Sequence, residues 1–141
     1  MNKLDAKERA LAIMDDYKVG SLATVKNGKP HSRYMTFFHE KFTLFTPTSK
    51  ETYKTEEVEE NPAIHVLLGY DGEGFGDEFI EFQGKAVIRE GKEWRERFWN
   101  DTMGLYFDGP EDESMIILEL QPETIRLMNS KDDTPETVSF T

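Results

Sequence analysis

The sequence predicts a mainly β fold of the α+β class, an antiparallel β-barrel of six to seven strands with flanking helices. Short runs of alternating apolar and polar residues follow one another with turn-sized gaps, and a few helical segments are inserted between them. This order favours an antiparallel barrel over a doubly wound sheet. Because we find no internal repeat and no long linker, residues 1–128 should form one domain, followed by a loose tail over residues 129–141.

Composition restricts the classes of function. A chain of 141 residues with 10 Phe can build one hydrophobic core, and the lack of cysteine excludes disulfides, thiolate catalysis, iron–sulfur clusters and zinc–thiolate sites. A net charge of −11 argues against nucleic acid as a partner. No apolar run is long enough to cross a bilayer and the N-terminus does not resemble a signal peptide, so we expect a cytoplasmic protein without a membrane partner.

The first expected elements are a helix and a β-hairpin. Asp5, followed three residues later by Glu8, marks a capped helix start, and this helix should cover one end of the barrel. The alternating run Val19–Lys26 predicts a strand. Asn27-Gly28 comes next and is the strongest short hairpin signal, because both turn residues need positive φ. A second strand, which carries Arg33, should follow this turn.

A third strand and a helix are expected next. The chain should turn at His39-Glu40 and form a strand over Phe42–Thr46, which Pro47 should end because proline cannot donate a ladder hydrogen bond. Thr48 and Glu51 have the spacing of a capping box, which predicts the start of a helix.

This helix should carry two lysines at its start. Lys50 and Lys54 would lie on one face of its first turns, and Asn61-Pro62 should end it, because a residue before proline avoids the α region. The stretch Lys26–Lys54 has six basic and two acidic residues in a chain of net charge −11. Together with Arg33 and the helix amides, the lysines could bind a phosphate. The alternative, that these lysines are ordinary solvated surface, stays open on spacing alone.

The second half of the sequence adds strands around an acidic connection. Ala63–Tyr70 and Phe79–Ile88 both alternate between apolar and polar residues, and the acidic run Asp71–Glu78 between them should be a loop. Gly84 interrupts the inward-facing row of the second of these strands. A glycine at such a position indicates a bulge or a close backbone approach.

An aromatic helix and two last strands complete the expected fold. Gly91–Met103 should form a helix on which Trp94, Phe98, Trp99 and Met103 cluster. This cluster is expected to pack across a barrel opening or a dimer contact rather than to bind a cofactor. Met115–Leu120 and Glu123–Met128 should be separate strands, with the loose tail starting at Asn129.

Side chains for metal binding or nucleophilic catalysis are not grouped in the sequence. His31, His39 and His65 fall on different predicted elements and lack ligand spacing, so we expect no metal site. Serines and carboxylates form no recognisable nucleophile–base set. Redox chemistry would therefore have to come from a bound cofactor.

Five short motifs between Tyr17 and Met128 occur in a characteristic order. They are PHSRYM (30–35), LFTPTSKETYK (44–54), VEENP (58–62), FQGKA (82–86) and FDGPEDE (107–113). This order resembles the FMN-binding split-barrel proteins related to pyridoxamine 5′-phosphate oxidase, and most of all the general stress protein 26 family. The resemblance implies a single split-barrel domain that binds a flavin, FMN with FAD as the alternative. Independently of the resemblance, a small barrel with 12% aromatic residues has spare apolar surface, so we expect a homodimer with two equivalent flavin sites at its interface.

The resemblance also assigns residues to the flavin, which would lie along the second and third strands. By position, Arg33, Thr52 and Lys54 would bind the phosphate with Ser49 and Lys50 nearby, the backbone of Tyr34, Met35 and Thr36 would face the flavin ring, and Phe45 and Thr46 would flank it.

Departures from the family pattern argue against a true pyridoxamine phosphate oxidase. Phe38 stands where those enzymes carry a lysine, and no histidine follows His65, so the Arg-x-His substrate clamp is missing. In many relatives a tryptophan ends the last strand, where this chain has Arg126-Leu127-Met128. We therefore expect a flavin-binding, stress-related oxidoreductase acting on an unidentified small molecule. The alternatives are a flavin-binding or sensing module without turnover, and a barrel that binds haem or a deazaflavin.

Overall fold

The computed structural model describes residues 5–72, 78–129 and 135–140, without the side chains of Tyr53 and Lys54. In these residues one antiparallel sheet has the strand order β2-β1-β5-β6-β7-β4-β3, and β8 pairs with β7. The strands are β1 (Val19–Lys26), β2 (Lys29–Thr36), β3 (Phe38–Glu40), β4 (Thr43–Ser49), β5 (Ala63–Leu68), β6 (Phe79–Arg89), β7 (Met115–Met128) and β8 (Glu136–Val138). The helices are α1 (Ala6–Asp16), α2 (Tyr53–Glu60) and α3 (Lys92–Phe98), and a 3₁₀ segment η1 covers Asp101–Leu105.

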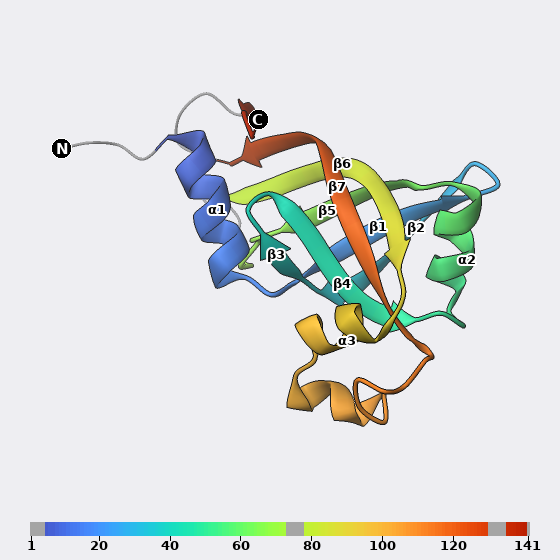
Figure 1. The fold of residues 1–141 in the computed structure, drawn as a ribbon. Helices are drawn as coiled ribbons and strands as arrows, with labels where there is room; N and C mark the ends of the chain where they lie inside the picture. Colours follow the sequence, from blue (N-terminus) through green and yellow to red (C-terminus); the bar gives the residue numbers. More distant parts are fainter. Residues whose placement is uncertain (1–4, 73–77, 130–134, 141) are drawn as a thin grey trace.

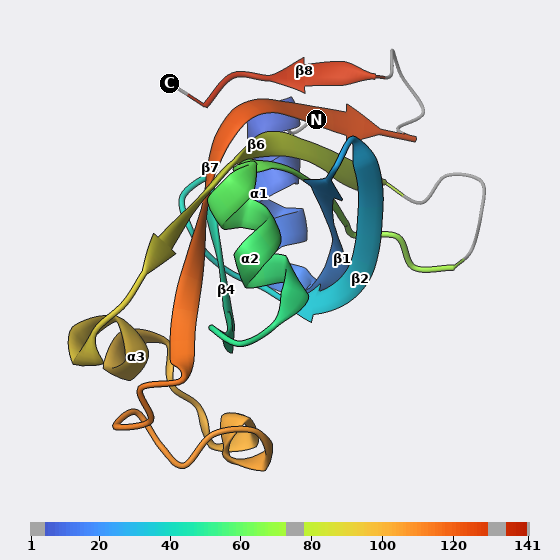
Figure 2. The same ribbon diagram turned by 90° about the vertical axis from the view of Figure 1, so that its right-hand side faces the viewer.

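The sheet curls into a split β-barrel, as the sequence predicted, although the described strands number eight rather than six or seven. Helix α1 lies at one end of the curl and α2 at the other, while α3 and η1 lie outside it beside β4 and β7 (Figures 1 and 2). The large core cluster fills the curl, with Leu22, Val66, Phe82 and Leu118 among its fully buried members. In the described part of the chain, none of the helices has the length and apolar character of a membrane span.

The helix cap and the first hairpin are confirmed. A carboxylate oxygen of Asp5 accepts a hydrogen bond from the Glu8 backbone N–H at 2.8 Å, which caps α1. Asn27 and Gly28 have φ values of 52° and 74°, as a hairpin turn between β1 and β2 requires.

Two predictions about the second and third strands are wrong. Phe38–Glu40 forms the short strand β3, and the chain turns one residue later, at Lys41, whose φ is 53°. Pro47 does not end β4, which pairs with β7 as far as Ser49. Strand β3 pairs with β4 only as far as Phe45. At Pro47 the edge of β4 opposite β7 therefore has no β3 partner, and the missing proline N–H breaks no hydrogen bond between β3 and β4.

The predicted capping box at the start of α2 is also wrong. Thr48 still belongs to β4, and α2 begins at Tyr53 with Thr52 as its N-cap, so Lys50 precedes the helix. The pairing of β4 with β7 outweighs the local capping signal. The predicted end of this helix at Asn61 is confirmed.

The longest strand pair contains a bulge. The register between β6 and β7 shifts between Gln83 and Gly84, which confirms the bulge predicted at Gly84. At this shift Glu123 of β7 has no partner in β6, and β7 continues past it. Strand β7 therefore runs unbroken from Met115 to Met128, and the prediction of two separate strands is wrong. Ile116 and Leu118 of β7 face the large core, and Met115 and Ile117 face the aromatic cluster on the other side, which explains the continuous apolar run.

The aromatic cluster forms, but on a shorter helix than predicted. Helix α3 ends at Phe98, and η1 follows after Asn100, so the single helix expected over Gly91–Met103 is wrong. Phe98 and Met103 pack with Phe45, Met115 and Ile117, and partly buried Trp94 and Trp99 cover them.

The C-terminal segment is not a loose tail throughout. Strand β8 pairs with β7, Val138 is buried in the large core and Phe140 packs against it. Residues 130–134 and 141, and residues 73–77 of the predicted acidic loop, lie outside the described part of the chain.

Candidate functional site

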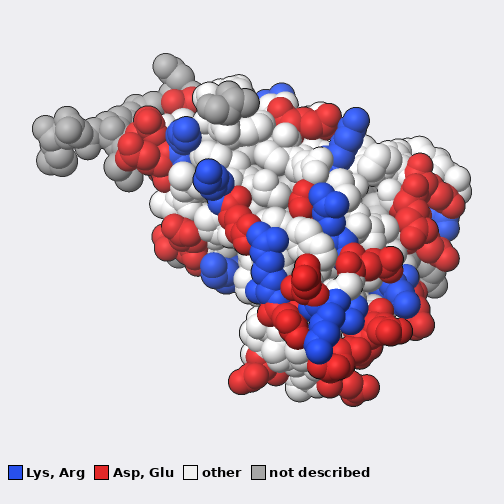
Figure 3. Space-filling view, in the orientation of Figure 1, with Lys and Arg blue, Asp and Glu red and all other residues white. Residues whose placement is uncertain are grey.

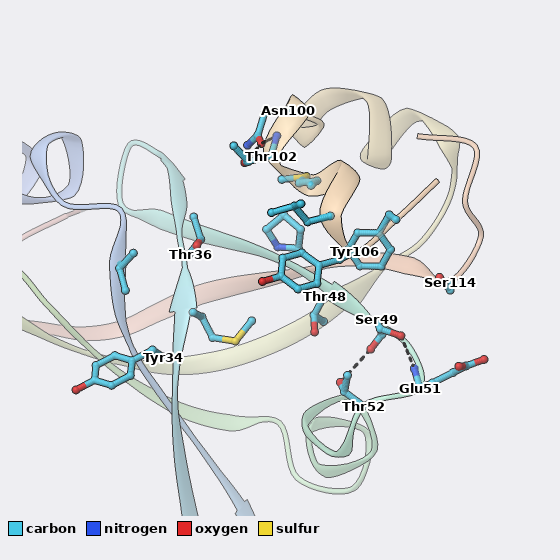
Figure 4. Close-up of a pocket in the computed structure, with 16 residues that line it drawn as sticks. Tyr34, Thr36, Thr48, Ser49, Glu51, Thr52, Asn100, Thr102, Tyr106 and Ser114 are labelled. Atoms are coloured by element: carbon cyan, nitrogen blue, oxygen red, sulfur yellow. Dashed lines mark hydrogen bonds between the residues drawn. The ribbon is translucent and has the colours of Figure 1, made fainter. Parts of the chain in front are cut away.

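A cavity of about 870 Å³ opens beside the barrel between three segments of the chain (Figure 4). Strand β2 contributes Tyr34, Met35 and Thr36, and the β4–α2 junction contributes residues that include Ser49, Glu51 and Thr52. The third wall comes from residues 100–107, which follow α3. Five of the ten residues assigned to the flavin by resemblance, Tyr34, Met35, Thr36, Ser49 and Thr52, therefore line one cavity.

The β4–α2 junction is held by its own hydrogen bonds. Thr52 and Thr55 each donate a hydroxyl hydrogen bond to the Ser49 carbonyl oxygen at 2.9 Å, and the Glu51 N–H donates to Ser49 Oγ at 3.2 Å. The Lys50 N–H donates to the Ser114 carbonyl at 2.8 Å, which ties the junction to the loop before β7. The hydroxyl groups at the cavity wall are thus fixed in place.

The loop that follows the third wall, residues 108–114, is held by two side chains. Buried Arg95 donates from Nε to the Pro110 carbonyl at 2.6 Å. Asp112 accepts hydrogen bonds from the hydroxyl and N–H of Ser114 and from the Asp108 N–H, and these bonds hold the pKa of Asp112 below its ordinary value. The loop over residues 108–114 therefore keeps a defined shape.

Strand β2 faces the cavity, whereas two predicted neighbours of the flavin lie behind the wall. Thr46 is buried and donates from Oγ1 to the Thr36 carbonyl at 2.8 Å, so it supports β2 rather than lining the cavity. Phe45 stacks on Phe98 at a ring-centroid distance of 4.7 Å, within the aromatic cluster.

Arg33 points to α2 rather than lining the cavity. Its Nη2 lies 3.3 Å from a carboxylate oxygen of Glu57, and Nη1 donates to Thr24 Oγ1 at 2.8 Å and to the Leu22 carbonyl at 3.3 Å. His31 Nδ1 lies 2.7 Å from the other oxygen of Glu57. Burial raises the pKa of Glu57, but the hydrogen bonds from Thr24, His31 and Arg33 outweigh burial and leave the pKa below its ordinary value.

The cavity carries little charge. Among the described lining residues Glu51 alone is ionisable as an acid or base near neutral pH, and the Lys50 side chain is exposed outside the lining. The Lys54 side chain lies outside the described part of the chain.

On the face shown in Figure 3, Lys and Arg alternate with Asp and Glu. Ion pairs such as Arg89–Glu119 and Lys92–Glu111 occur among the described residues, where no cluster of three potential metal ligands is found.

Sequence reasoning missed Glu57 and the wall over residues 100–107. Glu57 sits in an acidic helix where its neighbours Glu56, Glu59 and Glu60 are exposed, so nothing in the local pattern singles it out. Tyr106 and Leu105 are more than 80% exposed at the cavity rim. The sequence offered only one signal for them, a run of apolar residues after the predicted aromatic helix.

Comparisons with known proteins agree with this fold. The family model described as pyridoxamine 5′-phosphate oxidase matches residues 6–129. General stress protein 26 of Bacillus subtilis (strain 168) is 55% identical over 135 residues, which are 96% of each protein. The crystal structure of General Stress Protein 26 from Bacillus anthracis str. Sterne has a TM-score of 0.85 at 34% identity, and covers 96% of this chain and 98% of its own.

A second solved structure extends the likeness. The putative pyridoxamine 5′-phosphate oxidase from Listeria innocua has a TM-score of 0.80 at 40% identity, over 89% of this chain and all of its own. Identity at this level over almost the whole length, with the same curled sheet, reflects common descent. The chain therefore belongs to the pyridoxamine 5′-phosphate oxidase family and, within it, to the general stress protein 26 group.

Proposed function

We propose that the protein is a cytoplasmic, stress-related flavoprotein that binds FMN, with FAD as the alternative, in the cavity between β2, the β4–α2 junction and residues 100–107. One observation carries the proposal. Two groups of residues assigned to the flavin by family resemblance, Tyr34–Thr36 and Ser49 with Thr52, line this cavity together although they are separated in the sequence. A FAD-binding protein from Mesorhizobium loti has the same fold, with a TM-score of 0.70 at 19% identity.

The cavity fits a flavin in size and in the chemistry of its walls. Its volume of about 870 Å³ lies in the range of small-molecule sites. The backbone of Tyr34–Thr36 would offer polar groups to the ring edge, and Met103 and Phe107 would offer apolar contact. Arg33, Thr52 and Lys54 would hold the phosphate, with Ser49 and Lys50 beside them. A bound flavin would supply hydride and electron transfer, chemistry that the protein side chains lack.

We further propose an oxidoreductase acting on a small molecule that is not a phosphorylated vitamer. Apart from Glu51 no charged side chain is found among the described lining residues, so the space beside the flavin suits an uncharged molecule. The competing function is a flavin-binding or sensing module without turnover. The two differ in whether a reduced flavin in the protein can pass electrons to an added acceptor.

Haem is the second candidate cofactor. A heme binding protein from Mycobacterium smegmatis has the same fold, with a TM-score of 0.80 at 15% identity over 60% of its chain. Among the described residues, however, no histidine lines the cavity: His31 contacts Glu57 and His39 contacts Asp15. The usual axial ligand is therefore missing there, which favours flavin.

The site is proposed to be completed by a second copy of the chain. Tyr34, Leu105 and Tyr106 stand at the cavity rim and are each more than 80% exposed. Large exposed apolar side chains grouped around a cavity indicate a surface that a partner molecule covers. A twofold homodimer is the commonest such assembly.

The visible spectrum of the purified protein tests the proposal. Titration with FMN should give flavin bands that stay with the protein on gel filtration, and anaerobic NADPH or NADH should bleach them. Recovery of the bands on adding an electron acceptor would support the oxidoreductase. If neither NADPH nor NADH bleaches the bands, the result would support the binding module. A protein that retains haem and not flavin would overturn the assignment.

A further inference from the structure

Glu57 of α2 is a buried carboxylate that contacts Thr24 of β1 and both His31 and Arg33 of β2. Its side chain is only 1% exposed, and both oxygens have partners. One oxygen accepts from Thr24 Oγ1 and from Arg33 Nη2, and the other lies 2.7 Å from His31 Nδ1. Because an unpaired buried charge is costly, this arrangement holds all four side chains in one fixed geometry.

The same contacts leave Arg33 with unused donors. A guanidinium has five N–H groups, and three of them are directed to Leu22 O, Thr24 Oγ1 and Glu57. The remaining two, on Nε and Nη2, make no hydrogen bond to a described residue. Adjacent guanidinium nitrogens match two oxygens of one phosphate, so Arg33 can keep Glu57 and still bind a phosphate through its other edge.

Glu57 also relates Arg33 to the cavity. It follows Thr52, the N-cap of α2 at the cavity wall, by five residues, which is about 7.5 Å along a helix axis. The guanidinium held by Glu57 is therefore attached to the same helix whose N-cap lines the cavity.

We propose that Glu57 is a positioning residue of the flavin site, which fixes Arg33 so that its unused N–H groups receive the flavin phosphate. The inference rests on the proposed function, since it requires that a flavin phosphate binds beside Arg33. Glu57 has two opposing effects: its charge repels a phosphate, and its contacts orient the guanidinium. In our proposal the second effect is larger, and this sets the sign of the expected change.

The test compares FMN with riboflavin, which has the same ring and no phosphate, by fluorescence quenching on the flavin-free protein. The variants are Glu57→Gln and, as the matched control, Glu56→Gln, which removes the same charge from an exposed position on the same helix. Glu57→Gln should raise Kd for FMN about tenfold, as is typical when a residue that orients a ligand-binding group is lost, and leave Kd for riboflavin unchanged. Glu56→Gln should change neither value.

Several outcomes would overturn the proposal. An unchanged or lower Kd for FMN would mean that Glu57 only repels the phosphate, and an equal loss for both ligands would mean a purely structural role. In an Arg33→Ala background, Glu57→Gln should have no further effect on FMN, because its effect passes through Arg33. Wild-type protein that binds neither ligand would instead refute the proposed function.

A second variant covers the case in which Glu57→Gln does not fold. Thr24→Val keeps the side-chain shape but removes the hydroxyl that contacts both Arg33 and Glu57. It should weaken FMN binding and leave riboflavin binding unchanged. Equal affinity of this variant and the wild type for FMN would contradict the proposal.

Discussion

Gly84 of β6 lies directly against the backbone of Gln121 of β7. A Cβ atom at position 84 would come within 2.0 Å of the Gln121 carbonyl oxygen, so no other residue fits without moving a strand. The contact coincides with the register shift in the β6–β7 pair, which joins the two longest strands of the sheet. The bulge thus depends on the absence of a side chain.

Replacing Gly84 by Ala should therefore destabilise the fold by about 2–3 kcal/mol, because the strand must shift to relieve the overlap. Urea unfolding followed by circular dichroism measures the change. Gly104→Ala is the matched control: nothing lies within 4 Å of its added methyl group, and its effect should stay below about 0.5 kcal/mol. Equal stability of the two variants would show that the sheet adjusts at no cost.

Local signals in the sequence were sufficient for the elements that local geometry determines. The Asp5 cap, the Asn27-Gly28 turn and the strand Val19–Lys26 occur as predicted, and so does the bulge at Gly84. The cap, the turn and the bulge depend on backbone requirements of one or two residues, and the strand depends on a short alternating pattern. The split barrel itself was predictable because these elements follow one another in hairpin order.

Long-range contacts account for the errors. A strand end was predicted at Pro47 and a break was predicted between Leu120 and Glu123, but pairing with distant strands carries β4 and β7 through both positions. Likewise Val138 reads as part of a tail, yet it is buried through pairing of β8 with β7. At the candidate site, the partnership of Arg33 with Glu57 joins residues 24 positions apart, which no sequence spacing indicates.

The Glu57 cluster should make stability depend on pH. The pKa of Glu57 in the folded protein lies below its ordinary value of 4.5, so its stabilising contribution is present above pH 4.5 and is lost as pH falls through the folded pKa. Glu57→Gln should lower the free energy of unfolding by about 2 kcal/mol at pH 7, less than for a fully buried pair because Arg33 is partly exposed. The difference from wild type should shrink below pH 4.5.

Urea unfolding at pH 7, 5 and 3.5 measures this difference. Glu56→Gln, on the exposed side of the same helix, provides the control and should differ little from wild type at every pH. A difference between Glu57→Gln and wild type that stays constant across this range would rule out the charged form of Glu57 as its source.

The exposed rim of the cavity predicts a dimer. Light scattering should give about twice the chain mass of 16.4 kDa. Leu105→Glu should shift the protein toward monomer and weaken flavin binding, since it places a charge in an apolar contact. Thr137→Glu, an exposed position on β8, is the control. A wild-type protein that is monomeric with flavin bound would contradict the proposed interface.

Lys54 should contribute to phosphate binding. Lys54→Ala should weaken FMN binding by about 1.5–3 kcal/mol, the range of a hydrogen bond to a charged group, and leave riboflavin binding unaffected. Lys131→Ala, near the C-terminus, removes the same charge and serves as the control. If both variants bind FMN equally well by fluorescence quenching, Lys54 is ordinary surface.

Three arginines in the second half of the chain are engaged by contacts away from the cavity. Arg97 donates from Nε to a carboxylate oxygen of Glu40 at 3.0 Å, and buried Arg95 donates to a backbone carbonyl. Arg89 pairs with Glu119. None of these three arginines lines the cavity, where Glu51 would instead repel a phosphate.

The protein should therefore not oxidise pyridoxamine or pyridoxine 5′-phosphate at a rate above free flavin. Oxidation requires that a dianionic substrate is held against the flavin, and positioning of this kind supplies much of an enzyme's rate. Phe38, where true oxidases carry a lysine, packs against Phe98 at a ring-centroid distance of 6.0 Å and offers no charge. The measurement is formation of pyridoxal 5′-phosphate by FMN-loaded protein in the presence of oxygen, with free FMN as the blank. Steady product formation would mean that cations from a partner chain, or Lys54, hold the substrate phosphate.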